Sequence, residues 1–410
     1  MDPLSYLFGL EQFGIKFGLD NIRAIVARLG HPERSFRSIH VAGTNGKGSV
    51  TAMVDAGLRA AGHRVGRYTS PHLVRLNERF AVAGRPVDDE TMLTAVASVQ
   101  QAIEALIKEG VLAVQPTFFE ATTAAAFEIF RRANVELAVV EVGLGGRLDA
   151  TNVLSPEVTA ITSIAFDHQL YLGSTLESIA IEKAGILEAG VPVVLGPMDA
   201  EAESAIRRVA ADVGAPIVQT SPADVENRVV ELAGAHQRAN AAIAVQILQI
   251  LNERGISAGS DAIAAALSAT WPGRMDFRRL ADGRELLMDA AHNAAGAEAL
   301  AAYLRAQPGG ARPLVFAAMR DKDVMNMFRA LLPSVSHLVV TRAETARSAD
   351  PKDLAQEARA IAHDVPVTIE PSLPAALAAA WRIAEPNTCI VVAGSIFLLG
   401  DVMKHLGLHC

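Results

Sequence analysis

The stretch GTNGKGS at residues 43–49 brings glycines, a lysine and a hydroxyl into one short segment between an apolar run and a helical period. Glycines let backbone N–H groups approach an anion closely, and a lysine can reach the outer phosphates of a nucleotide. The common phosphate-loop pattern G-x-x-x-x-G-K-[ST] has the hydroxyl directly after the lysine, whereas here a glycine intervenes. A tight turn without a ligand is the alternative, but the combination favours nucleotide binding. The residues predicted to surround the phosphates are Gly43, Gly46, Lys47, Gly48 and Ser49.

Two later stretches end apolar runs with side chains that could bind a metal ion. Glu141 closes LAVVEV, and Asp167 and His168 close TSIAFDH. The carboxyl end of a parallel strand is where such sheets bind ligands, and Mg²⁺ prefers oxygen ligands. Glu141 therefore suits a magnesium site, with a solvated glutamate as the alternative. Histidine is an unusual ligand for Mg²⁺, so residue chemistry alone favours a hydrogen-bonded turn residue at His168.

The second half of the chain repeats this arrangement. Asp289 ends the apolar run ELLMDA and is followed by His292 and Asn293, which is typical of a ligand-facing loop ahead of a helix. Arg274 follows a Pro-Gly pair and could extend its guanidinium to phosphates, although a solvated arginine is the ordinary alternative. Lys183 lies within a helical period, where a solvated lysine is the ordinary interpretation.

Apolar runs that alternate with helical segments must position these residues, and this alternation indicates parallel βαβ units. The pattern pauses at ATWPGRMDF, so we predict two domains, residues 1–270 and 280–410, joined by a linker at 271–279. The fold class is α/β, with a phosphate-loop-containing parallel sheet in the N-terminal domain and a smaller, Rossmann-like C-terminal domain. The predicted N-terminal strands cover 38–43, 137–142, 158–165 and 191–196, and the helices 49–62, 118–132, 176–188, 201–213 and 236–268. The predicted C-terminal strands cover 285–290, 312–319, 337–340 and 388–394, and the helices 296–306, 323–332, 351–362 and 373–383.

Composition excludes some classes of protein. The 410 residues carry a formal net charge of −8, which argues against a nucleic-acid binder with a basic face. Two cysteines make neither a disulfide framework nor a zinc cluster, and this fits a reducing compartment. The N-terminus lacks the positively charged start of a signal peptide, and no apolar run is long enough to span a bilayer. We expect a soluble, cytoplasmic monomer without a membrane or nucleic-acid partner.

Several motifs together resemble the bifunctional folylpolyglutamate synthase/dihydrofolate synthase family, a branch of the muramyl-ligase superfamily. They extend over nearly the whole chain in family order: FGLDNI, GTNGKGS, TSPHL, TFFEATTAAAF, EVGLGGRLDATN, SIAFDH, EKAGI, PGR, DAAHN, DKD and GSIFLLGDV. The most specific are EVGLGGRLDATN and the loop with the displaced hydroxyl, which is the family's own form. One departure is Ala294, where the family usually has a proline after HN.

The resemblance implies a set of site residues. Those expected to bind ATP are Asn45, Gly46, Lys47, Gly48, Ser49, Asn240, Arg274 and Asp289. Those expected to hold Mg²⁺ are Ser70, Glu141 and His168, with Lys183 as a ligand of a second ion once it is carbamylated. Those expected near the pterin are Gly18, Leu19, Phe119, Glu120, Leu148, Asp149 and Ala150, while His292 and Ser395 would place the incoming glutamate. The residues expected to be catalytic are Lys47, Lys183, Arg274 and His292.

The implied reaction is an ATP-dependent amide ligation. ATP would phosphorylate a substrate carboxylate, and the amine of L-glutamate would then displace the phosphate, with dihydropteroate or a folate as the acceptor. The implied cofactors are ATP and two Mg²⁺ ions, with a monovalent cation as a further candidate. A muramyl-type ligase of cell-wall precursors is the nearest alternative, but it predicts an additional N-terminal domain. A P-loop switch or motor and a non-catalytic binding protein are more distant alternatives.

Overall fold

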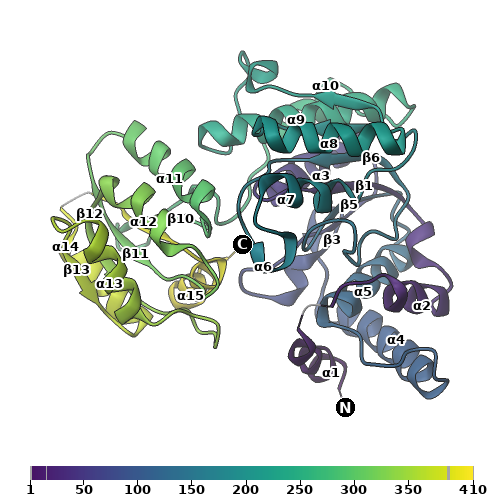
Figure 1. Cartoon of the computed structure of the whole chain (residues 1–410), viewed down its shortest axis with the longest axis horizontal. Helices are drawn as coiled ribbons and strands as arrows, with labels where there is room; N and C mark the ends of the chain where they lie inside the picture. The colour runs from purple at the N-terminus through teal and green to yellow at the C-terminus, as the bar shows by residue number, and fades with distance from the viewer. Residues whose placement is uncertain (1, 15, 386–387, 410) are drawn as a thin grey trace. The chain divides into compact units, whose positions relative to one another are not determined.

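The computed structural model describes residues 2–14, 16–385 and 388–409. The chain forms two compact units, whose helices and strands are labelled in Figure 1. The N-terminal unit comprises Met1–Ile164, Leu170–Glu231 and Arg238–Thr270. The C-terminal unit comprises Ala165–Gln169, Leu232–Gln237 and Trp271–Cys410. Two short stretches therefore group with the C-terminal unit although their neighbours in sequence build the N-terminal one.

The N-terminal unit contains an eight-stranded sheet with the order β4-β3-β2-β5-β1-β6-β7-β8. The strands from β2 to β8 in this order are parallel, whereas β3 and β4 extend one edge in antiparallel pairs. The central strand is β1, so the loop that follows it leaves the middle of the sheet. The strands are β1 (Arg37–Ala42), β2 (Val65–Tyr68), β3 (Phe80–Val82), β4 (Arg85–Pro86), β5 (Leu137–Glu141), β6 (Pro156–Ile161), β7 (Val193–Leu195) and β8 (Ile217–Gln219).

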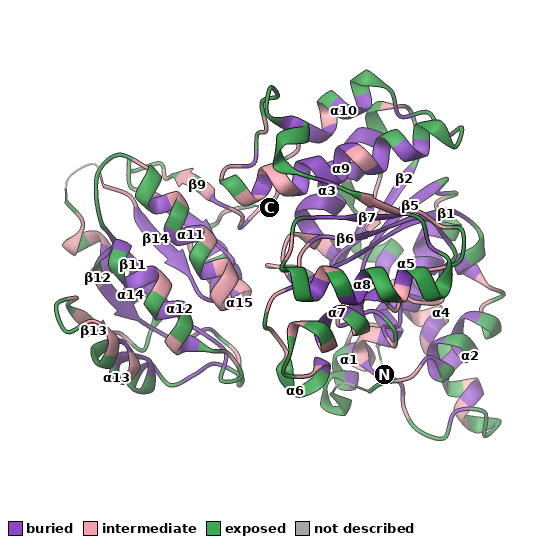
Figure 2. Ribbon diagram, turned by 45° about the horizontal axis from the view of Figure 1, so that its top comes forward, coloured by how far each residue is buried: buried purple, intermediate pink, exposed green. Residues whose placement is uncertain are grey.

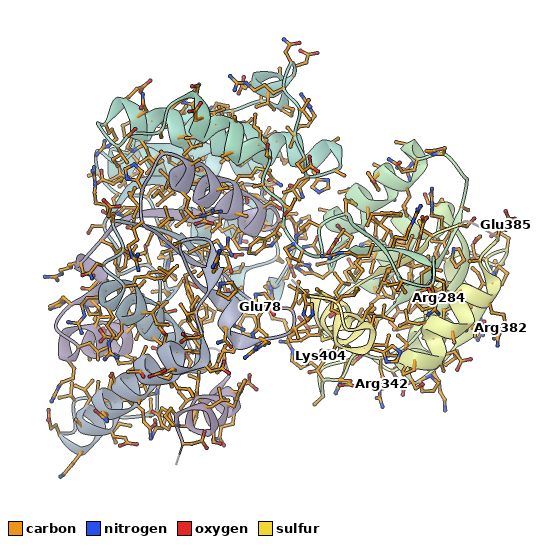
Figure 3. The ribbon with its side chains drawn as sticks, turned by 180° about the vertical axis from the view of Figure 1, so that it is seen from behind. Glu78, Arg284, Arg342, Arg382, Glu385 and Lys404 are labelled. Atoms are coloured by element: carbon orange, nitrogen blue, oxygen red, sulfur yellow. The ribbon has the colours of Figure 1, made fainter. Side chains whose placement is uncertain are left out.

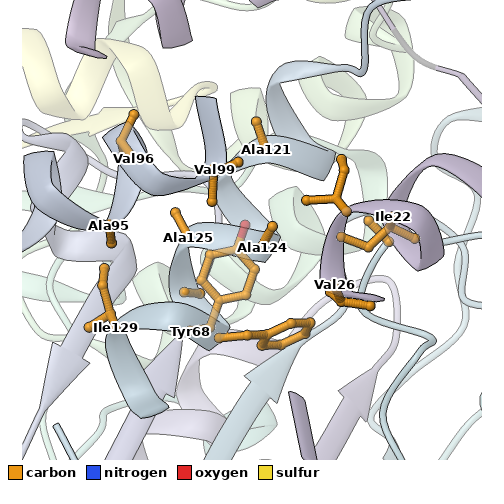
Figure 4. Close-up of a cluster of buried hydrophobic side chains, with 14 of the residues drawn as sticks. Ile22, Val26, Tyr68, Ala95, Val96, Val99, Ala121, Ala124, Ala125 and Ile129 are labelled. Atoms are coloured by element: carbon orange, nitrogen blue, oxygen red, sulfur yellow. The ribbon is translucent and has the colours of Figure 1, made fainter. Parts of the chain in front are cut away.

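Helices of the N-terminal unit bury apolar faces against this sheet and against each other. The alanine-rich face of α5 packs with α2, α4 and the Tyr68 ring of β2 in one buried cluster (Figure 4). The helices are α1 (Pro3–Gly9), α2 (Asp20–Arg28), α3 (Lys47–Ala60), α4 (Asp89–Lys108), α5 (Phe118–Arg132), α6 (Gln169–Leu172), α7 (Leu176–Ala184), α8 (Ala200–Val213), α9 (Ala235–Glu253) and α10 (Ser260–Leu267). Single 3₁₀ turns are η1 (Leu10–Phe13), η2 (Pro32–Arg34), η3 (Leu76–Arg79) and η4 (Pro222–Val225).

The C-terminal unit contains a six-stranded sheet with the order β13-β12-β11-β14-β10-β9, parallel except for the edge pair of β9 and β10. Its central strands are buried, whereas its helices have exposed outer faces (Figure 2). The strands are β9 (Asp276–Arg279), β10 (Glu285–Asp289), β11 (Arg312–Phe316), β12 (Val335–Val340), β13 (Val367–Ile369) and β14 (Ile390–Ala393). The helices are α11 (Ala294–Ala306), α12 (Val324–Leu331), α13 (Pro351–Ile361), α14 (Leu373–Ile383) and α15 (Ile396–Leu406), with the 3₁₀ turn η5 (Leu332–Ser334).

The predicted α/β class and the predicted parallel strands are confirmed, whereas one predicted helix is wrong. The segment 236–268 forms two helices, α9 and α10. Gly255 between them has φ +82°, a left-handed conformation that ends a helix. Part of the predicted linker, residues 276–279, pairs with β10 as strand β9.

Candidate active site

The loop between β1 and α3 has a backbone that only glycine suits at two positions. Gly43 has φ +145°, and a Cβ atom there would lie 1.9 Å from the Thr162 hydroxyl. Gly46 has φ +90°, and a Cβ atom there would lie 2.3 Å from Oδ1 of Asn240. Asn240, which was predicted to contact ATP, therefore lies directly against the phosphate loop within the N-terminal unit.

The end of β6 fixes the same loop from the other side. The Thr162 hydroxyl donates to the Asn45 carbonyl at 2.6 Å, and Asn45 N–H donates to the Ser163 hydroxyl at 3.1 Å. These two hydroxyls were not predicted as site residues, although they follow an apolar run in the sequence. Their role here is to set the loop's shape before any ligand arrives.

Two lysine side chains meet at one carbonyl oxygen of this loop. Nζ of Lys47 donates to Gly43 O at 3.0 Å, and Nζ of Lys183 donates to the same oxygen at 2.9 Å. Lys183 is buried on α7, so its interpretation as a solvated helical lysine is wrong. One carboxylate offsets this positive charge, because Oε1 of Glu141 lies 3.9 Å from Nζ of Lys47. Positive charge thus gathers at the loop that the sequence predicts to bind the phosphates of a nucleotide.

Oxygen atoms suited to a divalent cation surround this charge. Glu141 is buried at the end of β5 and accepts a hydrogen bond from Ser70 N–H at 3.3 Å. The buried Ser49 hydroxyl on the first turn of α3 has no hydrogen-bond partner in the described part of the chain. A buried hydroxyl without a partner and a buried carboxylate are each oxygen ligands of the kind that Mg²⁺ takes, together with waters and phosphate oxygens. Accordingly, the described residues contain no cluster of three or more His, Cys, Asp or Glu side chains that could hold a metal by themselves.

The residues predicted to contact the pterin lie partly at the start of α5. Thr117 caps this helix: its hydroxyl accepts from Glu120 N–H at 3.1 Å, and the Glu120 carboxylate accepts from Thr117 N–H at 2.7 Å. Phe119 packs so closely on Gly143 that a Cβ atom there would lie 2.4 Å from the ring. The Tyr68 and Phe119 ring centres are 6.0 Å apart. These contacts hold Phe119 against Tyr68 of the sheet and hold Glu120 at the start of α5.

Asp149, also predicted near the pterin, anchors the loop after β5. Its carboxylate accepts from Leu144 N–H at 2.8 Å and from the N–H and hydroxyl of Thr151. Burial raises the pKa of Asp149, although these hydrogen bonds act in the opposite direction. The Thr151 hydroxyl also contacts Nε2 of His40 at 2.8 Å. Thr151 and His40 were not predicted, and they connect the loop to the central strand.

The remaining residues predicted near the pterin differ in exposure. Leu19 precedes α2 and is buried, as is Ala150, whereas Gly18 and Leu148 are half-buried.

In the C-terminal unit, Asp289 ends β10 beside the predicted Arg274. Its carboxylate accepts from Met275 N–H and Ala291 N–H, both at 2.9 Å. Burial raises the pKa of Asp289, and the charges of Arg274 and His236 oppose that shift. His236, which was not predicted, comes from one of the short stretches that group with this unit.

A second cluster in the C-terminal unit surrounds Asp167. Its carboxylate contacts Nζ of Lys322 at 2.5 Å, Nδ2 of Asn293 at 3.1 Å and Nε2 of His292 at 3.3 Å. Burial raises the pKa of Asp167, but His292, Lys322 and His168 outweigh it and hold the pKa well below its usual range. The predicted metal ligand His168 belongs to this unit and has φ +51°, whereas the other predicted metal ligands belong to the N-terminal unit.

Ser395, predicted to place glutamate, precedes α15. Its hydroxyl accepts from Phe397 N–H at 3.1 Å, so it caps this helix. No helix among the described residues has the length and apolar character to span a bilayer.

Comparisons with known proteins identify the family of this chain. Residues 41–228 match the Mur ligase middle domain, and residues 273–396 match the Mur ligase glutamate ligase domain. The dihydrofolate synthase/folylpolyglutamate synthase of Bacillus subtilis is 35% identical over 440 residues, covering 99% of this chain and 98% of that protein.

Solved structures of similar proteins cover nearly the full length of both chains. The folylpolyglutamate synthase of Mycobacterium tuberculosis, complexed with ADP and AMPPCP, has a TM-score of 0.90 at 31% identity and covers 100% of this chain and 99% of its own. Escherichia coli FolC in complex with DHPP and ADP has a TM-score of 0.88 at 30% identity, with coverages of 99% and 98%. A bifunctional folylpolyglutamate synthase/dihydrofolate synthase with Mn, AMPPNP and L-glutamate bound has a TM-score of 0.86 at 30% identity, with coverages of 100% and 98%.

Proposed function

Because this chain belongs to the folylpolyglutamate synthase/dihydrofolate synthase family of Mur ligases, we propose that it is an ATP-dependent amide ligase. It adds L-glutamate to folates and to 7,8-dihydropteroate. The observation that carries this proposal is the pair of lysine ammonium groups that share the Gly43 carbonyl beside Glu141. Such a concentration of positive charge suits the outer phosphates of ATP.

The first chemical step joins the acceptor to phosphate. A carboxylate oxygen of the acceptor attacks the γ-phosphorus, the bond to the ADP oxygen breaks, and an acyl phosphate forms. Lys47, held at 3.0 Å from Gly43 O, stays close to the phosphates and offsets the charge that develops on the transferring group. The loop N–H groups between Asn45 and Ser49 orient the phosphates, because Thr162 and Ser163 already fix this backbone.

Few protein atoms would hold the divalent cation. Ser49, Ser70 and Glu141 would offer hard oxygen ligands, and His168 would offer a nitrogen ligand. When bound, Mg²⁺ neutralises phosphate charge and polarises the γ-phosphoryl group. These roles, and that of a monovalent cation, are part of the proposal.

Carbamylation of Lys183 is part of the proposal and comes from the family resemblance. Its Nζ is buried beside the phosphate loop, 2.9 Å from the Gly43 carbonyl oxygen. Addition of this amine to carbon dioxide, with loss of a proton, would give a carbamate whose carboxylate could attract Lys47 and ligate a second Mg²⁺ ion.

The second chemical step forms the amide. The glutamate amine attacks the activated carbonyl, phosphate leaves, and the amine loses a proton. We assign the acceptor and ATP to residues 1–270, and glutamate to residues 280–410 across the linker at 271–279. His292 and Ser395 place the glutamate, while Arg274 and Asp289 contact the nucleotide. His292 is held for this task, because Nδ1 contacts the Ala290 carbonyl at 2.8 Å and therefore carries a proton.

The test is product formation by the purified protein with ATP, Mg²⁺ and L-glutamate. Dihydropteroate should yield dihydrofolate and tetrahydrofolate should yield a diglutamate, each with release of ADP that depends on glutamate. A UDP-muramyl precursor with an amino acid serves as the comparison for a cell-wall ligase. Absence of product with both pterins would reject the assignment, and turnover of the muramyl precursor would replace it.

A further inference from the structure

Arg79, the last residue of η3, is a buried cation whose surroundings set it apart. It is 8% exposed, and no carboxylate lies within 4 Å of its guanidinium among the described residues. Its guanidinium donates from Nε–H to Nδ1 of His72 at 3.0 Å and also has the Tyr68 hydroxyl as a hydrogen-bond partner. Both partners are neutral, and a guanidinium has five N–H donors, so donors remain for an anionic ligand. Burying a charge without an opposite charge costs several kcal/mol, on the order of the stability of a small domain.

Two other arginines with little exposed surface, one intermediate and one buried, have different partners. Arg67 contacts the buried Asp55 carboxylate at 3.0 Å, and Arg312 donates to the carbonyls of Gly310 and Pro308. For Arg79, burial lowers the pKa, and Tyr68, Glu11 and Glu141 counteract this only in part. The arrangement is that of a cation whose partner is supplied by a ligand.

A structural role in holding the neighbouring loop accounts for only one donor of Arg79, the Nε–H group that bonds to His72. The loop from Leu73 to Arg75 is already fixed by Glu78, whose side chain is labelled in Figure 3. The Glu78 carboxylate accepts from the N–H groups of Leu73, Val74 and Arg75 at 2.7, 2.9 and 2.6 Å. Glu78 thus supplies most of the hydrogen bonds that hold the loop, and Arg79 adds the one to His72.

The surroundings of Arg79 indicate which ligand it meets. Its guanidinium carbon lies 5.2 Å from the centre of the Phe118 ring, next in sequence to Phe119. Phe118 is half-buried and stacks on the exposed Phe8 at 6.0 Å, so aromatic surface leads from solvent to the cation. Arg79 also lies within electrostatic reach of Glu141, which flanks the phosphate loop. A ligand here needs a flat aromatic body and an anionic end that points toward the phosphates.

We propose that Arg79 binds the reacting carboxylate of the pterin acceptor and selects acceptors that carry it. The inference rests on the proposed function, since the acceptor of that reaction has an aromatic body and a carboxylate directed at ATP. Bidentate contacts between a guanidinium and a carboxylate are short and directional, so Arg79 also orients the nucleophile.

The test compares two ligands in wild type and variants. One is the acceptor that the wild type turns over best, and the other is the same molecule with its reacting carboxylate replaced by an uncharged carboxamide. Affinities are measured by calorimetry with Mg²⁺ and ADP present and glutamate absent. A hydrogen-bonded charge pair contributes about 1.5–3 kcal/mol, so the wild type should prefer the carboxylate by roughly 10- to 150-fold.

Arg79→Met should lose this preference, leaving the two affinities within about threefold of each other. Arg79→Lys keeps the charge but not the bidentate geometry, so it should retain an intermediate ratio, and it carries the test if the methionine variant does not fold. Arg75→Met, in the same loop but exposed and paired with Asp89, is the matched control and should keep the wild-type ratio. Affinity for ADP reports the integrity of the phosphate loop in every variant.

A wild-type preference that persists unchanged in both Arg79 variants overturns the inference, as does a wild type without any preference. Both results leave the proposed function intact if product forms. A wild type that forms no product with either pterin rejects the proposed function itself.

Discussion

A buried hydroxyl determines the protonation of the histidine beside it. Thr151 has one hydroxyl proton and donates it to Asp149, so Nε2 of His40 must carry the proton in their 2.8 Å contact. Nδ1 of His40 then has only a lone pair, and it has no hydrogen-bond partner among the described residues. The folded protein therefore holds this imidazole neutral, next to the loop expected to contact the pterin.

This histidine makes stability depend on pH. Burial lowers the pKa of His40 to about 3, so below its usual pKa of about 6.5 the unfolded chain binds a proton that the folded chain does not. The free energy of unfolding should therefore fall by up to about 1.4 kcal/mol per pH unit as the pH decreases from about 6 to 4. Replacing the ring by His40→Gln should flatten this slope in urea denaturation curves. His405→Gln, which replaces an exposed histidine, is the control, and an equal slope in wild type and His40→Gln would contradict the argument.

Lys183 is the residue for which sequence and structure differ most. Its position within a helical period predicts an ordinary solvated lysine. Only the family resemblance implies a role, that of a metal ligand after carbamylation. The side chain is buried because α7 packs on the glycine-rich loop after β5, where a Cβ atom at Gly146 would lie 2.7 Å from the Lys183 carbonyl. Such a close approach depends on two segments distant in sequence, so no local pattern reveals it.

Substituting Lys183 separates a charge role from a carbamate role. Lys183→Ala should reduce kcat by about 10²–10³-fold, because it removes a group proposed to stabilise charge at the γ-phosphate. Lys183→Arg keeps a positive charge but cannot form a lysine carbamate, so it should be as inactive as the alanine variant. ADP release in the presence of glutamate is the measurement, with ADP affinity as the check on folding. Wild-type activity in the arginine variant would exclude the carbamate.

At the scale of elements, the sequence predicts the strands around the site better than the elements that flank them. The apolar runs before Gly43 and at Glu141 are buried on both faces, so their composition indicates β1 and β5 directly. The helix α4 and the strand β2 were not predicted, although α4 begins with a clear Asp88 cap. The strand VGRY of β2 contains a glycine and an arginine, and it forms because Tyr68 packs into the core.

The cap of α5 links helix stability to acceptor binding. Thr117→Val removes the hydroxyl that accepts from Glu120 N–H and donates to the Glu120 carboxylate, which should cost about 1 kcal/mol of stability and hold the Glu120 side chain less firmly. We therefore expect a higher KM for the pterin acceptor with little change in the KM for ATP. The control is Asp88→Ala, which removes the equivalent cap of α4 and should lower stability without changing either KM. Equal effects of both variants on the acceptor KM would show that the cap has no specific role.

At the scale of the whole molecule, the chain does not divide into units at one point. Residues 165–169 group with the C-terminal unit although β6 before them and α7 after them belong to the N-terminal one. The composition break near Trp271 predicts the main boundary, because Pro and Gly interrupt the helical pattern there. No local sequence pattern predicts that residues 165–169 group with the C-terminal unit. Their contact with that unit through Asp167 and Lys322 joins residues that are 155 positions apart.

We predict that the ion pair of Asp167 and Lys322 stabilises the C-terminal unit, and that the contribution of each residue depends on the other. Lys322 and Asp167 are both more than nine-tenths buried, so Asp167→Asn or Lys322→Met alone leaves a charge without its main partner and should cost about 3 kcal/mol. The double variant removes both charges and should cost clearly less than the sum of the two single variants.

Both tryptophans of the chain, Trp271 and Trp381, lie in the C-terminal unit, so tryptophan fluorescence in urea reports on this unit within the full-length protein. Lys352→Met on the exposed face of α13 should change stability by less than about 0.5 kcal/mol. Additive costs in the double variant would show that each residue is held by its other neighbours, and that residues 165–169 are not tied to the unit through this ion pair.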